Sequence, residues 1–101
     1  MKIAFLGAGS VVFAKNHMSD LLSISSIREQ PLEFALNDID PERLLVAQKM
    51  AKNLGTCFKA KELRISASRN RRQILQGADF VICMINVGGY EATLDELHID
   101  K

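Results

Sequence analysis

The sequence has few cysteines, no excess of charge and no long apolar run near its start, and each shortage argues against a class of protein. The two cysteines, Cys57 and Cys83, lie in unlike surroundings without metal-type spacing, so we expect two reduced thiols in a cytoplasmic protein. Lys and Arg number 13 against 12 Asp and Glu, which favours neither nucleic acid nor an anionic membrane as partner. The apolar run after Lys2 is too short for a secretory leader or a membrane span.

One basic cluster is present and comprises Arg64, Arg69, Arg71 and Arg72. It lacks interleaved aromatic residues and is interpreted as a solvated loop and helix start.

Residues 2–13 combine a short apolar strand with a glycine turn. Ile3–Leu6 has the length of a buried parallel strand and leads into Gly-x-Gly before a helical pattern begins. Gly7 allows a tight turn, Gly9 lets the backbone approach a pyrophosphate, and the following helix offers unpaired N–H groups. The sequence therefore predicts a dinucleotide site, with an ordinary glycine turn as the alternative. The residues expected to contact the cofactor here are Gly7, Ala8, Gly9, Ser10, whose hydroxyl can reach the same phosphate, and Val11.

An acidic residue follows the second predicted strand, 32–36. In a mononucleotide-binding half, an acid at this tip accepts hydrogen bonds from the adenine ribose, and Asp38 is placed for that role. An acid there favours NAD over NADP, whereas Arg43, one turn into the next helix, leaves NADP open. Asp40 is expected to cap the helix that begins at Pro41, while no capping role is assigned to Asp38.

The remaining pattern alternates helices and strands. The third glycine of the dinucleotide fingerprint is replaced by Val12, so we expect a larger side chain between helix and strand. After a strand buried on both faces, Val87 and Gly88 are predicted to face the first glycine turn across the cofactor. The predicted helices are 11–27, 41–54 (stopped by Gly55) and 70–76, the further strands are 63–67 and 78–85, and 92–101 is expected to open a helix or lid.

This order predicts one domain over residues 1–101. The fold class is α/β: a Rossmann-like open parallel sheet of order 3-2-1-4 with helices on both faces, truncated after about four strands. The length falls short of a six-stranded dinucleotide fold, so we expect a fragment of a longer enzyme.

Four blocks of the sequence occur together in a family-specific order. They are Gly7–Ser10 with Phe13, Asp38–Leu44, Gly77–Ile82 and Val87–Glu91. Jointly they resemble the amino-terminal part of glycoside hydrolase family four, the NAD- and manganese-dependent α-galactosidases, α-glucosidases, galacturonidases and 6-phospho-glycosidases. The Gly-Gly-Tyr-Glu after the last strand is most similar to the α-galactosidase branch. Residues 91–95 lack the arginine typical of the 6-phospho branch, which disfavours a phosphorylated sugar.

The resemblance implies a redox route to hydrolysis. NAD would oxidise the sugar at C3, which makes the C2 proton acidic. A base would remove that proton, the C1 substituent would be eliminated, water would add and the hydride would return, with Mn²⁺ polarising the C3 oxygen. The family's metal ligands and its acid and base residues lie beyond the end of this sequence, so no catalytic or metal residue is assigned here. We therefore expect a sugar substrate, a homo-oligomeric enzyme, and a chain that is inactive on sugars by itself. The residues that do not match the metal ligands are Cys57, Cys83, His17 and His98.

Two other functions remain open at this point. An NAD-dependent dehydrogenase of small hydroxy acids would share the glycine turn and Asp38, but it would accumulate NADH. A non-catalytic nucleotide-sensing module is the other alternative, and for it these 101 residues would be the whole functional unit, with no metal-binding part after them.

Overall fold

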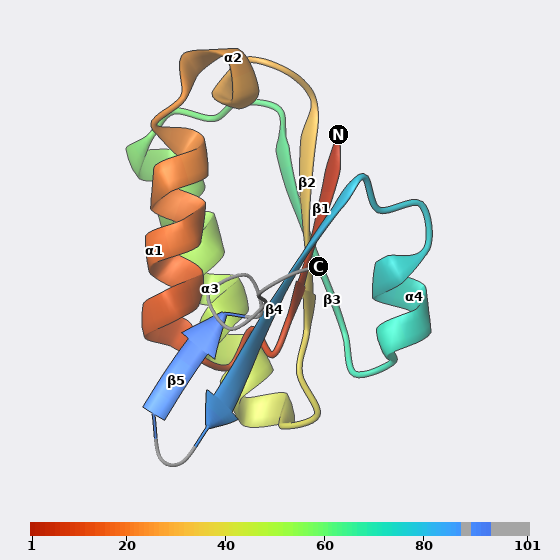
Figure 1. The fold of residues 1–101 in the computed structure, drawn as a ribbon. Coiled ribbons are helices and arrows are strands. Elements are labelled where there is room, and N and C mark those ends of the chain that lie inside the picture. Colours follow the sequence, from red (N-terminus) through yellow and green to blue (C-terminus); the bar gives the residue numbers. More distant parts are fainter. Residues whose placement is uncertain (88–89, 94–101) are drawn as a thin grey trace, which may run out of the picture.

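A computed structural model of the protein describes residues 1–87 and 90–93. Helices and strands alternate along the chain, and the strands form one twisted sheet (Figure 1). The strands are β1 (Lys2–Leu6), β2 (Leu32–Asn37), β3 (Leu63–Ser68), β4 (Phe80–Val87) and β5 (Tyr90–Thr93). The helices are α1 (Val11–Leu22), α2 (Ser25–Arg28), α3 (Pro41–Cys57) and α4 (Arg71–Leu75). None of the helices in the described part is both long and apolar enough to cross a membrane.

The sheet has the order β3-β2-β1-β4-β5, with β1 at its centre. The first four strands run parallel, and β5 pairs antiparallel with the end of β4. The predicted order 3-2-1-4 and the Rossmann-like α/β class are therefore confirmed. Leu6 is in register with Asn37, and Asn37 with Ser68, so β1, β2 and β3 end at one edge of the sheet.

Both faces of the sheet are covered by helices. Helices α1 and α3 pack side by side on one face, and the short α4 lies on the other (Figure 1). Because side chains of a strand alternate between faces, β1 sends Phe5 into the larger core and Ala4 toward α4. The rings of Phe5 and Phe34 meet edge to face, with their centroids 5.2 Å apart. Small residues on the other face let Ile74 of α4 reach the sheet.

Helix α3 begins as predicted and ends later than predicted. Asp40 accepts hydrogen bonds from the backbone N–H groups of Glu42 and Arg43, at 3.0 and 3.3 Å, and Pro41 follows it. The helix continues past the predicted stop at Gly55, which is buried. A Cβ at Gly55 would lie 2.9 Å from Cδ2 of Leu63, so this glycine allows α3 to pack closely against β3.

The predicted helix over 11–27 is two helices. Ile24 has an extended backbone, with ψ of 113°, between α1 and α2. The hydroxyl of Ser23 donates to the carbonyl of Asp20 at 2.7 Å, a local bond of the kind through which serines disfavour helix interiors. The serine-rich stretch is therefore where α1 ends.

Strand β4 also differs from its prediction. It begins at Phe80, because Ala78 still belongs to the turn after α4 and donates its N–H to the carbonyl of Leu75. The expectation of burial on both faces is wrong at its start, since Phe80 is 60% exposed and Val81 44% exposed. Strand β5 pairs only with the second half of β4, which leaves β1 as the sole strand neighbour of the first half among the described residues.

The region after β4 was expected to open a helix or lid at residue 92. Residues 92 and 93 instead belong to β5, an antiparallel strand. Residues 94–101 lie outside the described part of the chain.

Candidate functional site

The glycine turn joins β1 to α1 at the edge where the parallel strands end. Gly7 has φ of +78°, a left-handed conformation that favours glycine. The N–H groups of Gly7 and Ala8 both donate to the carbonyl of Asn37, at 2.9 and 2.8 Å, which fastens the turn to the end of β2. A Cβ on Gly7 would overlap the carbonyl oxygen of Met84 in β4. The turn is thus held between two strands in a shape that only glycine allows at its first position.

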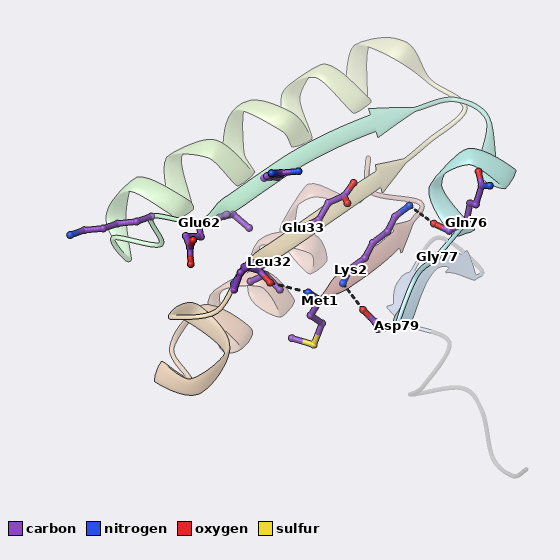
Figure 2. Close-up of a pocket in the computed structure, with 12 residues that line it drawn as sticks. Met1, Lys2, Leu32, Glu33, Glu62, Gln76, Gly77 and Asp79 are labelled. Atoms are coloured by element: carbon purple, nitrogen blue, oxygen red, sulfur yellow. Dashed lines mark hydrogen bonds between the residues drawn. The ribbon is translucent and has the colours of Figure 1, made fainter.

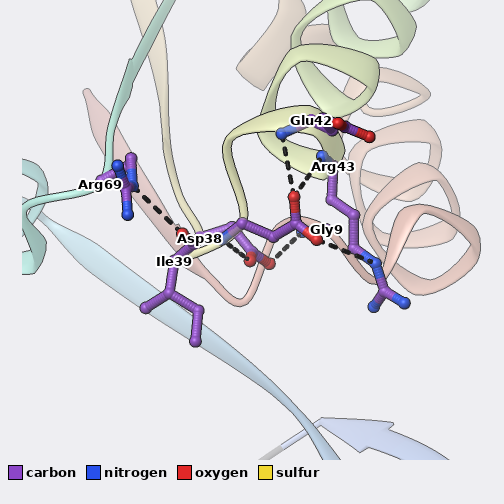
Figure 3. Close-up of polar contacts among 7 residues, drawn as sticks. Gly9, Asp38, Ile39, Glu42, Arg43 and Arg69 are labelled. Atoms are coloured by element: carbon purple, nitrogen blue, oxygen red, sulfur yellow. Dashed lines mark hydrogen bonds and ion pairs between the residues drawn. The ribbon is translucent and has the colours of Figure 1, made fainter.

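The carboxylate of Asp38 faces this turn (Figure 3). Its Oδ2 accepts a hydrogen bond from the N–H of Gly9 at 2.8 Å, and its Oδ1 accepts one from the N–H of Asp40 at 2.9 Å. A carboxylate can accept about four hydrogen bonds, so these two hold it in place and leave capacity for a ligand's hydroxyl groups. Asp38 therefore has a structural role that the sequence analysis did not assign, in addition to its predicted place at the site.

Gly9 also permits the close approach of the turn to the following loop. A Cβ at this position would lie 2.9 Å from Cγ of Asp38 and 2.8 Å from Cβ of Arg43. Both distances are shorter than ordinary van der Waals contact. Glycine at position 9 is thus required by the protein itself, besides the predicted approach of a pyrophosphate.

Helix α1 starts without a side-chain cap. Ser10 occupies the N-cap position, its hydroxyl makes no cap hydrogen bond, and the first turn contains no acidic residue. The first N–H groups of a helix lack partners within the helix and carry the positive end of its dipole. The N–H of Ser10 donates to the carbonyl of Gly7 at 3.0 Å, so the groups here that suit an anionic ligand are the hydroxyl of Ser10 and the N–H of Val11.

Val12 does not lie between helix and strand as expected. It is 66% exposed, whereas Ala8 and Ala14 are completely buried. The turn of the helix directs Ala14, and not Val12, toward the sheet. The expected effect of a missing third glycine on helix packing is therefore wrong.

Asn37, Ile39 and Arg69 lie beside the site, and the sequence analysis predicted no role for them in it. The side-chain amide of Asn37, only 7% exposed, donates to the carbonyl of Ser68 at 3.0 Å and so joins the ends of β2 and β3. Nε of Arg69 donates to the carbonyl of Ile39 at 3.1 Å. The role of Asn37 could have been suspected from the sequence, because a polar residue there ends an apolar strand. No feature of the sequence indicated the hydrogen bond between Arg69 and Ile39.

The basic cluster of the sequence is divided by the fold. Arg64 lies in β3, toward the amino ends of the strands, and lines a different hollow. The other three arginines surround a hollow of about 400 Å³ next to Asp38, which is lined by Asn37, Ile39, Arg69, Asn70, Arg71 and Arg72.

The remaining predicted site residues are only partly described. Val87 is the last residue of β4, the strand beside β1, and Gly88 lies outside the described residues. Cys57 ends α3 and Cys83 lies in β4. Within residues 1–87 and 90–93, no three His, Cys, Asp or Glu side chains gather so that they could hold a metal ion.

A larger hollow, of about 670 Å³, lies at the opposite edge of the sheet (Figure 2). Several polar groups around it bond one another: the amino group of Met1 donates to the carbonyl of Pro31 at 2.9 Å, and Nζ of Lys2 to that of Gln76 at 2.6 Å. The backbone N–H of Lys2 donates to Oδ2 of Asp79 at 2.8 Å. These bonds tie β1 to the segments before β2 and after α4, which is a structural role.

The chain matches one known protein family over almost its whole length. The family described as "Family 4 glycosyl hydrolase" matches residues 2–101. The chain belongs to this family. The resemblance seen in the four sequence blocks is thereby confirmed.

Individual relatives of this family 4 chain carry glycosidase names. It is 42% identical over 101 residues to an alpha-galactosidase of Bacillus subtilis (strain 168), a match that covers 99% of this chain and 23% of the relative. It is 38% identical over 100 residues to an alpha-galactosidase of Rhizobium meliloti (strain 1021), covering 97% and 19%. An alpha-glucosidase of Erwinia rhapontici is 38% identical over 97 residues, covering 93% and 20%. The chain therefore spans about a fifth of the length of these relatives.

Proposed function

We propose that this family 4 chain is the NAD-binding part of a glycosidase that hydrolyses O-glycosidic bonds of α-galactoside-like substrates. The observation that carries the proposal is the glycine turn, whose Gly9 faces the carboxylate of Asp38 where the parallel strands end. In open α/β sheets, ligands bind at this edge. Two of the relatives named above are alpha-galactosidases, which supports the substrate class.

The residues of this edge fit an NAD molecule. The pyrophosphate would lie against the N–H of Val11 at the uncapped start of α1, with the hydroxyl of Ser10 as a further donor. Gly7 and Ala8 hold the turn in the required shape through their bonds to β2. Asp38 keeps acceptor capacity for the hydroxyl groups of the adenine ribose. Val87 and Gly88 are proposed to border the cofactor from the β4 side.

When bound, NAD would reversibly accept a hydride from C3 of the sugar as the C3 hydroxyl loses its proton and becomes a ketone. The contribution of this chain is to hold the adenosine half in one pose. Because Asp38 is anchored by two backbone N–H groups, a ribose that binds it is fixed relative to the turn. Positioning of this kind is a major part of catalysis when two reactants must meet in a defined geometry.

Several finer features belong to the same proposal. We propose that Mn²⁺ is the metal of the reaction and assign none of this chain's residues to it. We further propose a non-phosphorylated sugar substrate, a cytoplasmic location and a homo-oligomeric enzyme. The chain alone is proposed to bind NAD without hydrolysing sugars.

Calorimetric titration of the purified protein with NAD and, separately, NADP tests the cofactor site. We expect saturable binding that is tighter for NAD, since Asp38 repels a 2′-phosphate. Folding is checked by far-UV circular dichroism. A folded protein that binds neither dinucleotide contradicts the proposal.

A second measurement separates a glycosidase from a dehydrogenase. In the intact enzyme, cleavage of an α-galactoside should require NAD while NADH does not accumulate, because the hydride returns to the sugar in each cycle. Stoichiometric accumulation of NADH would favour a dehydrogenase instead.

A further inference from the structure

The outer side of α3 carries two adjacent large apolar side chains that stay half exposed. Leu45 is 52% exposed and Val46 53% exposed. The opposite side of the helix is buried against the rest of the fold through Leu44, Ala47 and Ala51. Figure 1 shows α3 beside α1 on one face of the sheet. A single exposed apolar side chain is ordinary, whereas adjacent ones on the outer side of a long helix mark a candidate contact surface.

Two opposite charges lie on the same outer side of α3. Glu42 and Lys49 are both exposed, and seven residues separate them by about 10 Å along the helix axis, too far for a direct ion pair. No residue three or four positions from either one carries the opposite charge. The salt bridge found within residues 1–87 and 90–93 joins Arg43 to Asp40 and involves neither of them. Both charges are therefore available to a partner outside the chain.

The order of these four residues suits contact with a second copy of the same helix. A twofold axis between Leu45 and Val46 makes the two helices antiparallel and places Leu45 of one copy opposite Val46 of the other. The same axis places each Glu42 opposite the Lys49 of the other copy. The apolar side chains then meet in the middle, and an ion pair lies at each end, as in an interface with an apolar centre and a polar rim. A parallel arrangement would instead bring like charges together.

We propose that the outer side of α3 is a self-complementary contact between two copies of this chain. The inference rests on the homo-oligomeric state proposed above and names the surface that produces it. Helix α3 has 17 residues, so a contact along one of its sides buries less than the roughly 1,200 Å² of a standard interface. We therefore expect weak association, with monomer and dimer both present at about 100 µM protein.

Sedimentation equilibrium of the purified protein measures the dissociation constant of the dimer. Glu42→Lys and Lys49→Glu should each raise it about 10-fold, because each change turns two opposite-charge contacts into two like-charge contacts. An equimolar mixture of the two variants should associate about as tightly as the wild type, since a dimer with one copy of each variant again opposes unlike charges at both ends. A role of either residue within one chain cannot produce this recovery.

The apolar centre is tested with glutamine, a good helix former. Leu45→Gln combined with Val46→Gln should raise the dissociation constant at least about 10-fold, because the buried apolar area is lost. Val81→Gln is the matched control, since Val81 is 44% exposed and lies in β4. It should leave the dissociation constant within about 2-fold of the wild type. Far-UV circular dichroism checks that each variant is folded.

Three results would refute the α3 contact: a wild type that stays monomeric at about 1 mM, no recovery in the mixture, or loss of association in Val81→Gln alone. The last result would place the contact at the open edge of β4. Titration with NAD distinguishes these outcomes from failure of the cofactor proposal. A protein that binds NAD without associating loses only the α3 contact, and a protein that associates without binding NAD loses only the cofactor site.

Discussion

Adding one methyl group at Gly9 tests the central contact of the site. In Gly9→Ala, the new Cβ would occupy the space of the Asp38 carboxylate and would lie 2.8 Å from Cβ of Arg43. The carboxylate can swing away, but it then loses its hydrogen bond to the N–H of residue 9. The Cβ of Arg43 belongs to the start of α3 and cannot move as easily, so the turn itself must shift.

The expected cost follows from these contacts. A hydrogen bond to a charged group contributes about 1.5–3 kcal/mol, and replacing glycine by alanine returns about 0.4–1 kcal/mol by restricting the unfolded chain. We therefore expect Gly9→Ala to lower the free energy of unfolding by about 1–2 kcal/mol. In a domain of this size, each kcal/mol corresponds to a fall in Tm of about 4–8 °C. NAD binding should be lost as well, and the bulkier Gly9→Val should abolish it, because the pyrophosphate can no longer approach the backbone.

Urea denaturation followed by far-UV circular dichroism measures the stability, since the sequence contains no tryptophan. The decisive control is a double-mutant cycle with Asp38→Ala. When the carboxylate is already absent, Gly9→Ala should cost less, with a coupling of about 1 kcal/mol or more between the two sites. Equal costs in both backgrounds, or a Gly9→Ala protein as stable as wild type, would show that the close contact does not constrain the turn.

Three further predictions follow from contacts at the same edge. Asp38→Ala should weaken NAD binding by about 1–3 kcal/mol through lost ribose hydrogen bonds, and should reduce the preference for NAD over NADP; titration with both dinucleotides measures this, and an unchanged preference would remove the ribose assignment. Asp40→Ala should lower the free energy of unfolding by about 1 kcal/mol, because it removes the cap of α3, and unchanged stability in urea would contradict that role. Gly7→Ala should lower the free energy of unfolding by about 1–2 kcal/mol for the left-handed backbone alone, and by more because its Cβ meets the carbonyl of Met84. Gly77→Ala is the control, because Gly77 has φ of +73° and nothing within 4 Å of a Cβ. It should show only the backbone cost in the same urea denaturation.

The strand order and the start of the site could be predicted because they depend on local patterns. A short apolar run before Gly7 and Gly9, a second run ending at Asp38 and the cap at Asp40 each leave a signal within a few residues. The rule that crossovers between parallel strands are right-handed then restricts the order of the strands. The register that aligns Leu6 with Asn37 is consistent with that order.

What could not be predicted depends on contacts between residues far apart in the sequence. Gly55 is buried because α3 packs against β3 at Leu63. The hydrogen bond from Arg69 to Ile39 joins the loop after β3 to the loop after β2. The exposure of Phe80 follows from how few strand neighbours the start of β4 has, which an apolar run does not reveal. The phase of α1, which buries Ala14 and exposes Val12, is likewise set by the sheet.

The central position of β1 has a consequence for how the chain folds during synthesis. The first strand to leave the ribosome needs two partners, and both arrive later: Ile3 pairs with Phe34 and, on the other side, with Phe80. At a synthesis rate of about 5–20 residues per second, the second partner emerges about 4–15 s after the first strand. Until then β1 has no strand partner at first, and after β2 has emerged it can pair on one side only. Early pairing of β1 with β2, supported by α1 and α3, is therefore the step that would protect the nascent chain from aggregation.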